Sequence, residues 1–236
     1  MKIRVGTSGF AYKEWKGSFY PPKFKDEGLL AYYAERFDTV EINNTFYRMP
    51  KPELLGKWAA DTPEPFVFIL KAPQRITHIR KLEDCASDVE YFLKSAESLG
   101  AKRGPILFQL PPWMKKDLAK LDRFLALLPE GTRAAFEFRH ATWFDDETYA
   151  LLKQHQATLA ASETDEKTGE LGPPVLPTTD WGYFRLRRTD YTEADLRAWL
   201  ARIRDQPWTE AWLFFKHEDE GNAAVLATTF RGLLQA

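Results

Sequence analysis

Charged and aromatic residues alternate in the stretch RAAFEFRHATWF, residues 133–144. Phe136 and Phe138 alternate with Glu137 and Arg139, so a carboxylate and a guanidinium share one face of an otherwise apolar segment. Such a pair can bind an anion through the guanidinium, transfer a proton through the carboxylate, or form a space-filling ion pair. The choice depends on the other charged residues that share this face.

Polar residues also end the other short apolar segments of the chain. They are Thr7 and Ser8, Glu41, Asn43 and Asn44, Lys71, Gln109, Arg185 and Arg187, and Lys216 and His217. Side chains change face at every residue of a strand, so these polar groups point together to one side. Five cations outnumber two carboxylates in this set: Lys71, Arg139, Arg185, Arg187 and Lys216 against Glu41 and Glu137. The expected ligand is a small anionic molecule.

Several of these groups can also react. Glu41 and Glu137 can divide general acid and base roles, as the two carboxylates of glycoside hydrolases do. Lys71 or Lys216 can form a Schiff base, although an anion contact is the favoured role for both. Glu137–Arg139 and Glu41–Lys71 can equally be internal ion pairs.

Histidines raise the question of a metal. His78, His140 and His217 follow expected strands, and with two carboxylates they could bind a divalent ion. No pair has a diagnostic spacing, and the neighbouring cations repel a metal ion. We therefore expect no metal and no cofactor.

The elements that position these residues follow from hydrophobic periodicity. The expected strands are Ile3–Ser8, Thr39–Asn43, Phe66–Lys71, Pro105–Leu110, Arg133–Phe138, Ala157–Ala161, Tyr183–Arg187 and Trp212–Lys216. The expected helices are Leu29–Phe37, Pro52–Thr62, Asp88–Leu99, Asp117–Leu128, Asp145–Gln154, Thr192–Asp205 and Ala223–Leu234.

Alternation of eight strands with helices predicts an α/β fold with a parallel sheet, closed into a (β/α)8 TIM-type barrel. The connection Ser162–Trp181 is rich in glycine and proline, so a long loop is expected in place of the sixth helix. A doubly wound open sheet is the rival, but GTSGFAYKEWKG lacks its glycine-rich signature. One domain, residues 1–236, is expected, with the polar face at the carboxyl ends of the strands.

Aromatic residues are abundant in the loops. Phe10, Tyr12, Trp15, Phe19 and Tyr20 crowd the first loop, Phe46 and Tyr47 follow the second strand, and Trp113, Trp143 and Trp181 lie in later loops. Such rings either form an internal cap or offer a stacking surface for a sugar or a base. The second reading gives the alternative function, a module that binds or processes single-stranded nucleic acid.

Composition bounds the function further. The formal net charge of −1 gives no bulk attraction to nucleic acid or to an anionic membrane. A single cysteine, Cys85, excludes an internal disulfide. No signal peptide and no apolar run of about 18 residues is evident, so a cytoplasmic protein without a membrane partner is expected.

Taken together, the motifs GTSGF, EINNTFYRMP, FILKAP with ITH, FQLPP, EFRHATWF and YFRLR resemble domain-of-unknown-function family 72, the YecE-like proteins. The resemblance spans the chain and implies a TIM-type barrel without an established activity. It also implies a site, at Thr7, Ser8, Glu41, Asn43, Asn44, Tyr47, Lys71, Thr77, His78, Gln109, Glu137, Arg139, His140, Trp143 and Arg185. Lys216 and His217 stand where the family usually has two asparagines.

The leading hypothesis is an enzyme acting on a small anionic, phosphorylated or sugar-like substrate. Its catalytic residues would be Glu41, Glu137, Lys71 and His78. Its substrate-binding residues would be Thr7, Ser8, Asn43, Asn44, Tyr47, Gln109, Arg139, His140, Trp143, Arg185 and Lys216.

The absence of a metal can be tested directly. Elemental analysis of freshly purified protein should find no near-stoichiometric metal, because the cations at the strand ends oppose its binding. A full-occupancy zinc, manganese or iron signal would contradict this expectation and favour metal-assisted chemistry.

Overall fold

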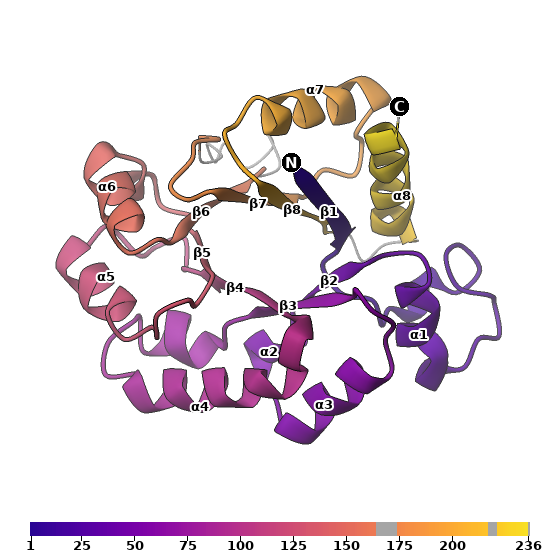
Figure 1. The fold of residues 1–236 in the computed structure, drawn as a ribbon, viewed down its shortest axis with the longest axis horizontal. Coiled ribbons are helices and arrows are strands. Elements are labelled where there is room, and N and C mark those ends of the chain that lie inside the picture. The colour runs from indigo at the N-terminus through magenta and orange to yellow at the C-terminus, as the bar shows by residue number, and fades with distance from the viewer. Residues whose placement is uncertain (164–173, 217–220, 236) are drawn as a thin grey trace.

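The computed structural model describes residues 1–163, 174–216 and 221–235. Its strands form a nearly closed ring of parallel neighbours, and the helices lie around it (Figure 1). The strands are β1 Lys2–Thr7, β2 Thr39–Ile42, β3 Val67–Lys71, β4 Arg103–Gln109, β5 Ala134–Glu137, β6 Thr158–Ser162, β7 Trp181–Leu186 and β8 Glu210–Phe215. This is the predicted (β/α)8 barrel.

Helices follow most of the strands. They are α1 Leu29–Ala34, α2 Asn44–Tyr47, α3 Pro52–Ala60, α4 Ala86–Ala96, α5 Leu118–Leu125, α6 Asp146–Gln154, α7 Glu193–Arg204 and α8 Asn222–Gln235. Proline stands in the first turn of α3, and a reciprocal pair of hydrogen bonds between Thr192 and Asp195 caps α7.

All eight strands lie within two residues of their predicted ends. The short helix α2 and a π-helical turn at Arg75–Ile79 were not predicted, because neither has enough residues to show a helical period. In the connection between β6 and β7, the described residues 174–180 contain no helix. Residues 164–173 of that connection, and His217, lie outside the described residues.

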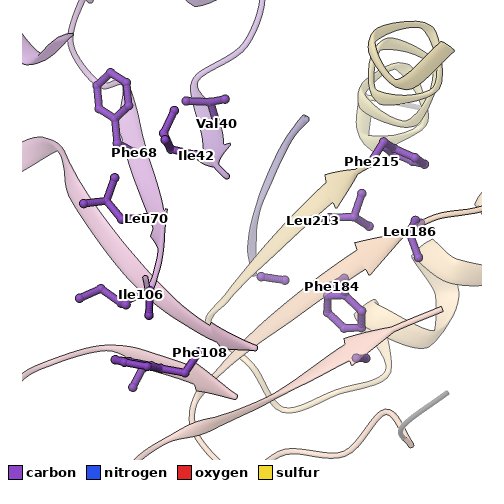
Figure 2. Packing of buried hydrophobic residues seen from close by; sticks show 14 of the residues in the cluster. Val40, Ile42, Phe68, Leu70, Ile106, Phe108, Phe184, Leu186, Leu213 and Phe215 are labelled. Carbon is purple, nitrogen blue, oxygen red and sulfur yellow. The ribbon is translucent and has the colours of Figure 1, made fainter. Parts of the chain in front are cut away.

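Side-chain alternation divides the apolar residues into two layers. Ile69, Leu107, Ala135, Ala160 and Trp212, with Trp181, Tyr183 and Phe214, fill the barrel interior. A larger cluster lies between the strands and the helices and includes Phe108 and Phe136. Figure 2 shows members of this outer cluster, such as Phe68 and Leu213, on strands from opposite sides of the barrel.

The predicted register of β5 is confirmed by these layers. Phe136 stacks on Phe108 with ring centroids 5.2 Å apart, and Phe138 stacks on Trp143 at 4.6 Å, both in the outer cluster. Glu137 lies between them in sequence and therefore points into the barrel, where it is 1% exposed.

The ring closes between β1 and β2 without a regular hydrogen-bond ladder. The hydrogen-bonded order of strands starts at β1 and ends at β2, and a single backbone bridge joins Ser8 to Glu41. The hydroxyl of Tyr33, on α1, accepts from the backbone N–H of Thr7 at 2.9 Å and donates to the carbonyl of Thr39 at 3.0 Å. A phenol thus replaces ladder bonds that the two strands do not make.

Close approach of the strands at this seam requires Gly6. A β-carbon at position 6 would lie 2.3 Å from the backbone oxygen of Thr39. At the amino-terminal end of the strands, Arg4 Nη1 donates to Asp38 Oδ2 at 2.7 Å and ties the two segments together. The seam therefore depends on side chains at both ends and at its centre.

The seam predicts a measurable role for one oxygen atom. Tyr33→Phe keeps the ring but leaves the Thr7 N–H and the Thr39 carbonyl unpaired, so the free energy of unfolding in urea should fall by about 1–3 kcal/mol. Tyr91→Phe, at an exposed ring on α4, is the control and should change it by less than about 0.5 kcal/mol. Equal stability of Tyr33→Phe and the wild type would show that the hydroxyl does not hold the seam.

Candidate functional site at the carboxyl end of the barrel

A polar layer covers the apolar interior at the carboxyl ends of the strands. We call it the mouth cluster and define it as Glu41 (β2), Lys71 (β3), Gln109 (β4), Glu137 (β5), Tyr183 and Arg185 (β7), and Arg187, which follows β7. Lys71, Gln109, Glu137 and Arg185 each lie on the inner face of their strand, two positions beyond the interior residues Ile69, Leu107, Ala135 and Tyr183. The prediction that these charges converge is confirmed by the contacts among them.

Arg185 is the centre of the cluster. Its guanidinium is 0% exposed and donates from Nη2 to Glu41 Oε1 at 2.8 Å and from Nη1 to Glu137 Oε2 at 2.6 Å. One guanidinium therefore joins carboxylates that come from β2 and β5. Two carboxylates around one buried cation satisfy both partners without solvent.

Glu41 is fully buried and has further donors. Oε2 accepts from the Tyr183 hydroxyl at 2.6 Å, and Oε1 accepts from Ser8 Oγ at 2.7 Å. Although burial alone would raise the pKa of Glu41, Arg185 and these donors hold it below its usual value. Glu41 is therefore an ionised acceptor at neutral pH.

Glu137 is held in the same way. Its Oε1 accepts from Gln109 Nε2 at 2.8 Å and from Arg187 Nη2 at 2.6 Å. Burial opposes ionisation, but the Arg187 and Arg185 guanidinium groups hold the pKa of Glu137 well below its ordinary range. A carboxylate with so low a pKa is a weak proton acceptor at neutral pH.

Lys71 has different surroundings. Its Nζ donates to Gln109 Oε1 at 2.7 Å and lies 4.0 Å from the centre of the Phe46 ring. Burial, together with the nearby cations Arg185 and Lys216, lowers the pKa of Lys71 to about 7 against the opposing effect of Glu137 and Glu41. Lys71 therefore changes charge near neutral pH.

Two further side chains, His78 and Arg187, also have lowered pKa values. Burial and the charges of Lys71 and Arg139 lower the pKa of His78 to about 4, so its imidazole is neutral at pH 7. Burial also lowers the pKa of Arg187, with Arg185 and Arg139 acting in the same direction and Glu137 opposing them. His78 Nδ1 lies 2.9 Å from Thr77 Oγ1, and its ring meets the edge of Phe46.

The structure brings most of the other predicted site residues to this end of the barrel. Ser8 binds Glu41, Asn43 Nδ2 donates to the same carboxylate at 3.3 Å, and Arg139 and Lys216 act on the cluster through their charges. Asn43, Arg139 and Lys216 are half-buried and lie at the rim.

Five other predicted site residues have their contacts away from the mouth cluster or are exposed. Thr7 points outward and binds Tyr33, and Trp143 is 0% exposed with its indole N–H on the Met114 carbonyl at 2.8 Å. Asn44 and Tyr47 are exposed on α2, and His140 Nδ1 lies 2.9 Å from Thr142 Oγ1. Thr7 points outward because it precedes the inward-pointing Ser8 by one residue and side chains alternate along a strand. Trp143 is buried because it stacks on Phe138.

Four site residues were not among the predicted catalytic and substrate-binding residues. Arg187 had been identified only as one of the charges that end the strands. Tyr183 shares the inner face with Arg185 by the alternation in YFRLR, but its hydroxyl contact with Glu41 was not predicted. Phe46 flanks Lys71 because of the unpredicted helix α2. Ser162 pairs in register with Arg185, and its buried Oγ has no hydrogen-bond partner among the described residues. β6 ends at Ser162, one residue later than predicted. With the correct end, Ser162 would have been recognised as a polar residue at a strand end.

Rings of the first loop form an internal cap rather than an open surface. Trp15 is 0% and Tyr20 2% exposed, and the loop packs on α1 through contacts such as Phe19 with Tyr33. In the described part of the chain, no three His, Cys, Asp or Glu side chains are grouped as metal ligands. None of the helices described there is long and apolar enough to cross a membrane.

Comparison with known proteins gives one consistent result. A family model described as "Protein of unknown function DUF72" matches residues 4–236. UPF0759 protein YunF of Bacillus subtilis is 26% identical over 230 residues, which is 92% of this chain and 79% of that protein. UPF0759 protein YecE of Escherichia coli K12 is 35% identical over 126 residues, 52% of this chain and 46% of that protein.

Solved structures agree with the fold. The DUF72 family protein TM1631 of Thermotoga maritima is 29% identical, with a TM-score of 0.90 and full coverage of both chains. The DUF72 family protein EF0366 of Enterococcus faecalis is 20% identical, with a TM-score of 0.80, covering 100% of this chain and 98% of that one.

The low pKa of Glu137 predicts acid sensitivity. A carboxyl whose folded pKa is lowered contributes stability above its unfolded pKa of roughly 4.3, and this contribution is lost as the pH falls below it. Glu137→Gln should lower the free energy of unfolding at pH 7 by about 3–5 kcal/mol, because Arg185 and Arg187 lose a counter-charge. It should also make the loss of stability between about pH 5 and pH 3 shallower.

Glu193→Gln is the matched control, since Glu193 forms an exposed ion pair with Arg197 on α7. Urea unfolding at several pH values should show a change of less than about 1 kcal/mol for this variant. A Glu137→Gln protein as stable as the wild type at pH 7 would mean that the ion pairs of Glu137 do not stabilise the fold.

Proposed function

We propose that this chain, which belongs to the DUF72 family of proteins of unknown function, is an enzyme that acts on a small anionic molecule at the barrel mouth. In this proposal Arg187 and its cationic neighbours bind the anion, and Lys71 is the group that reacts. The proposal rests on this chain's own side chains. Barrels of this type generally have their catalytic residues at the carboxyl ends of the strands, and this analogy supports the proposal.

The distribution of burial supports the binding part. Glu41 and Glu137 are 0% and 1% exposed and lie at the bottom of the polar layer. The Arg187 side chain is 16% exposed, and Lys71 is 8% exposed, so these cations lie closer to solvent than the carboxylates do. A molecule arriving from solvent therefore meets positive charge first, and a phosphate or carboxylate complements it.

The observation that carries the proposal is that Lys71 and Arg187 lie nearer to solvent than the two carboxylates, and the directions of three pKa values agree with it. Burial, with neighbouring cations, lowers the pKa of Lys71, of His78 and of Arg187, although two carboxylates belong to the same cluster. Arg185, which both carboxylates contact, is the exception and has a raised pKa. For Lys71, His78 and Arg187, burial is the largest cause of the lowered pKa and neighbouring cations add to it, so the part of the mouth around these three groups is short of negative charge. A bound anion supplies this charge.

Lys71 is a better reactive group than either carboxylate. The sequence suggested Glu41 or Glu137 as the general base, but both are locked into ion pairs with Arg185 and have lowered pKa values. We assign them a structural role that positions Arg185, Arg187 and Gln109. The lowered pKa of Lys71, about 7, suits proton exchange or nucleophilic attack at physiological pH.

Single-stranded nucleic acid is the alternative ligand. It would need exposed rings beside the cations for its bases to stack on. Trp15, Tyr20 and Trp143 are buried, so their rings do not offer a stacking surface to a base. Tyr47, which follows Phe46 in the sequence, is exposed. No observation favours this alternative over a small anion.

Anion binding should depend on the charge of Lys71. Calorimetric titration with inorganic phosphate, phosphoglycolate and pyruvate should detect binding at pH 6. The affinity for pyruvate, whose own charge is constant in this range, should fall as the pH rises from 6 to 9, since Lys71 loses its charge through its pKa of about 7. Glu41 and Glu137 stay ionised and His78 stays neutral over this range. Lys71→Met should remove most of the pH dependence.

Arg187→Gln should weaken anion binding by about 10- to 100-fold, the value of a charge-assisted hydrogen bond. Arg123→Gln, at an exposed position on α5, is the control and should bind as the wild type does. Absence of binding by all three compounds at pH 6, where Lys71 is charged, would refute the proposal.

A further inference from the structure

We infer that Lys71 is a nucleophile that forms an imine with the carbonyl group of an acid-bearing substrate, such as a 2-oxo carboxylate or a phosphorylated ketone. This inference rests on the proposed function, because it needs the acid group to be bound at the mouth. It specifies the substrate class and the covalent step.

The position of Lys71 is the first argument. It is the last residue of β3 and points inward at the carboxyl end of the barrel, with its amine above the interior residue Ile69. Phe46 covers one side of the amine at 4.0 Å from the ring centre. The face of the Phe46 ring attracts the ammonium form, but burial of the amine is the larger effect and lowers the pKa of Lys71, which favours the neutral form.

The hydrogen-bond partner of Lys71 is the second argument. Nζ donates to the amide oxygen of Gln109, not to a carboxylate. The Gln109 amide cannot turn its nitrogen toward Lys71 without losing the bond from Nε2 to Glu137 Oε1. A neutral amine can donate to an amide oxygen just as an ammonium does, so this contact holds the amine in place in both charge states.

Lys102 shows the contrast. It is also buried, at 7% exposure, but its Nζ donates to the carbonyl of Ala59 at 2.8 Å and to that of Thr62, and it lies 3.6 Å from a carboxylate oxygen of Glu64. Several acceptors and a carboxylate suit an ammonium. Among the residues that the structure describes, two lysines are therefore buried, Lys102 in a site made for a cation and Lys71 beside the amide oxygen of Gln109.

The charges around Lys71 are the third argument. Arg185 and Lys216 disfavour its protonation, and Glu137 and Glu41 favour it without forming an ion pair with it. With a pKa of about 7, about half of the Lys71 amine is neutral at pH 7. This fraction is on the order of a thousandfold larger than for a lysine of ordinary pKa.

Arg187 identifies the class of carbonyl compound. Its guanidinium donates to the Glu137 carboxylate, to which Gln109 also donates. Lys71 and Arg187 are thus connected through the hydrogen bonds of Gln109 and Glu137. Its Nε has no hydrogen-bond partner among the described residues. The Arg187 side chain is 16% exposed, so the acid group of a carbonyl compound that enters the mouth can contact the guanidinium while the Lys71 amine attacks the carbonyl carbon.

The covalent step is balanced without an added oxidant or reductant. The Nζ lone pair forms a bond to the carbonyl carbon as the C=O π pair moves to oxygen. The two hydrogens of the amine are transferred to that oxygen, which leaves as water while the C=N bond forms. The resulting imine, once protonated, withdraws electrons from a bond on the neighbouring carbon and so prepares it for cleavage or proton loss.

Reductive trapping tests the inference. Wild-type protein is incubated with pyruvate, dihydroxyacetone phosphate or acetone, each with sodium cyanoborohydride, and the reduced adduct is located by peptide mass mapping. Pyruvate and the phosphate compound distinguish a carboxylate from a phosphate as the acid group, and acetone lacks an acid group. At least one charged compound should modify Lys71 at least about tenfold more than any other lysine, because of its lowered pKa.

With each compound at a concentration that saturates the site at every pH, trapping at Lys71 should increase from pH 6 to pH 8, since the neutral amine increases as the pH passes its pKa of about 7. This trend is opposite to that expected for anion affinity, so the two proposals can be separated. Lys71→Arg should abolish the adduct while keeping a cation at the mouth, and Lys94→Gln, at an exposed lysine of α4, should leave it unchanged. Lys102 is an internal control in the same peptide map and should stay unmodified.

Three results would overturn the inference. Binding of the anions without any adduct at Lys71 would refute imine formation and leave the proposed function standing. Equal trapping of acetone and the charged compounds would refute the role of the acid group. An adduct spread evenly over many lysines would show that Lys71 is not a selective nucleophile.

Discussion

The charge contact on which the carboxyl end of this barrel depends is the pairing of one buried guanidinium with two carboxylates. Arg185 contacts Glu41 from β2 and Glu137 from β5, which are three strands apart in the ring. Removing either carboxylate would leave a buried cation underneutralised, and removing Arg185 would leave two buried anions. The network is retained because each member satisfies the others, not because burying charge is favourable.

The same contact determines the character of the groups above it. Arg185 and Arg187 both form ion pairs with the Glu137 carboxylate and neutralise most of its charge. The carboxylate therefore stabilises a positive charge on Lys71 only weakly. Gln109 transmits the effect: its nitrogen binds Glu137, so its oxygen faces Lys71. The low basicity of Lys71 thus results first from its burial and then from the charge of Arg185, which contacts the two carboxylates that would otherwise stabilise the ammonium.

Local pattern was sufficient to predict the eight strands, the barrel and the inward direction of Glu137, because alternation along a strand needs no knowledge of distant residues. Partner choice could not be predicted in this way. Lys71 could have paired with Glu41, and only the three-dimensional arrangement gives it Gln109 instead. Trp143 shows the same limit: its sequence position suggested a ligand contact, whereas stacking on Phe138 places it in the outer core. The basicity of Lys71 was equally inaccessible, since it depends on burial and on charges from several strands.

The seam between β1 and β2 gives the barrel an uneven mechanical character. Every other neighbouring pair of strands shares a backbone ladder, whereas this pair relies on Tyr33, one backbone bridge and the ion pair of Arg4 with Asp38. Side-chain contacts can break one at a time, but a ladder opens cooperatively, so local fluctuations concentrate at this seam. Ser8 and Glu41 lie at its carboxyl end, where the seam meets the mouth cluster. The seam therefore ends beside the Glu41 carboxylate that Arg185 contacts, so a parting of β1 from β2 would expose these buried ions to water.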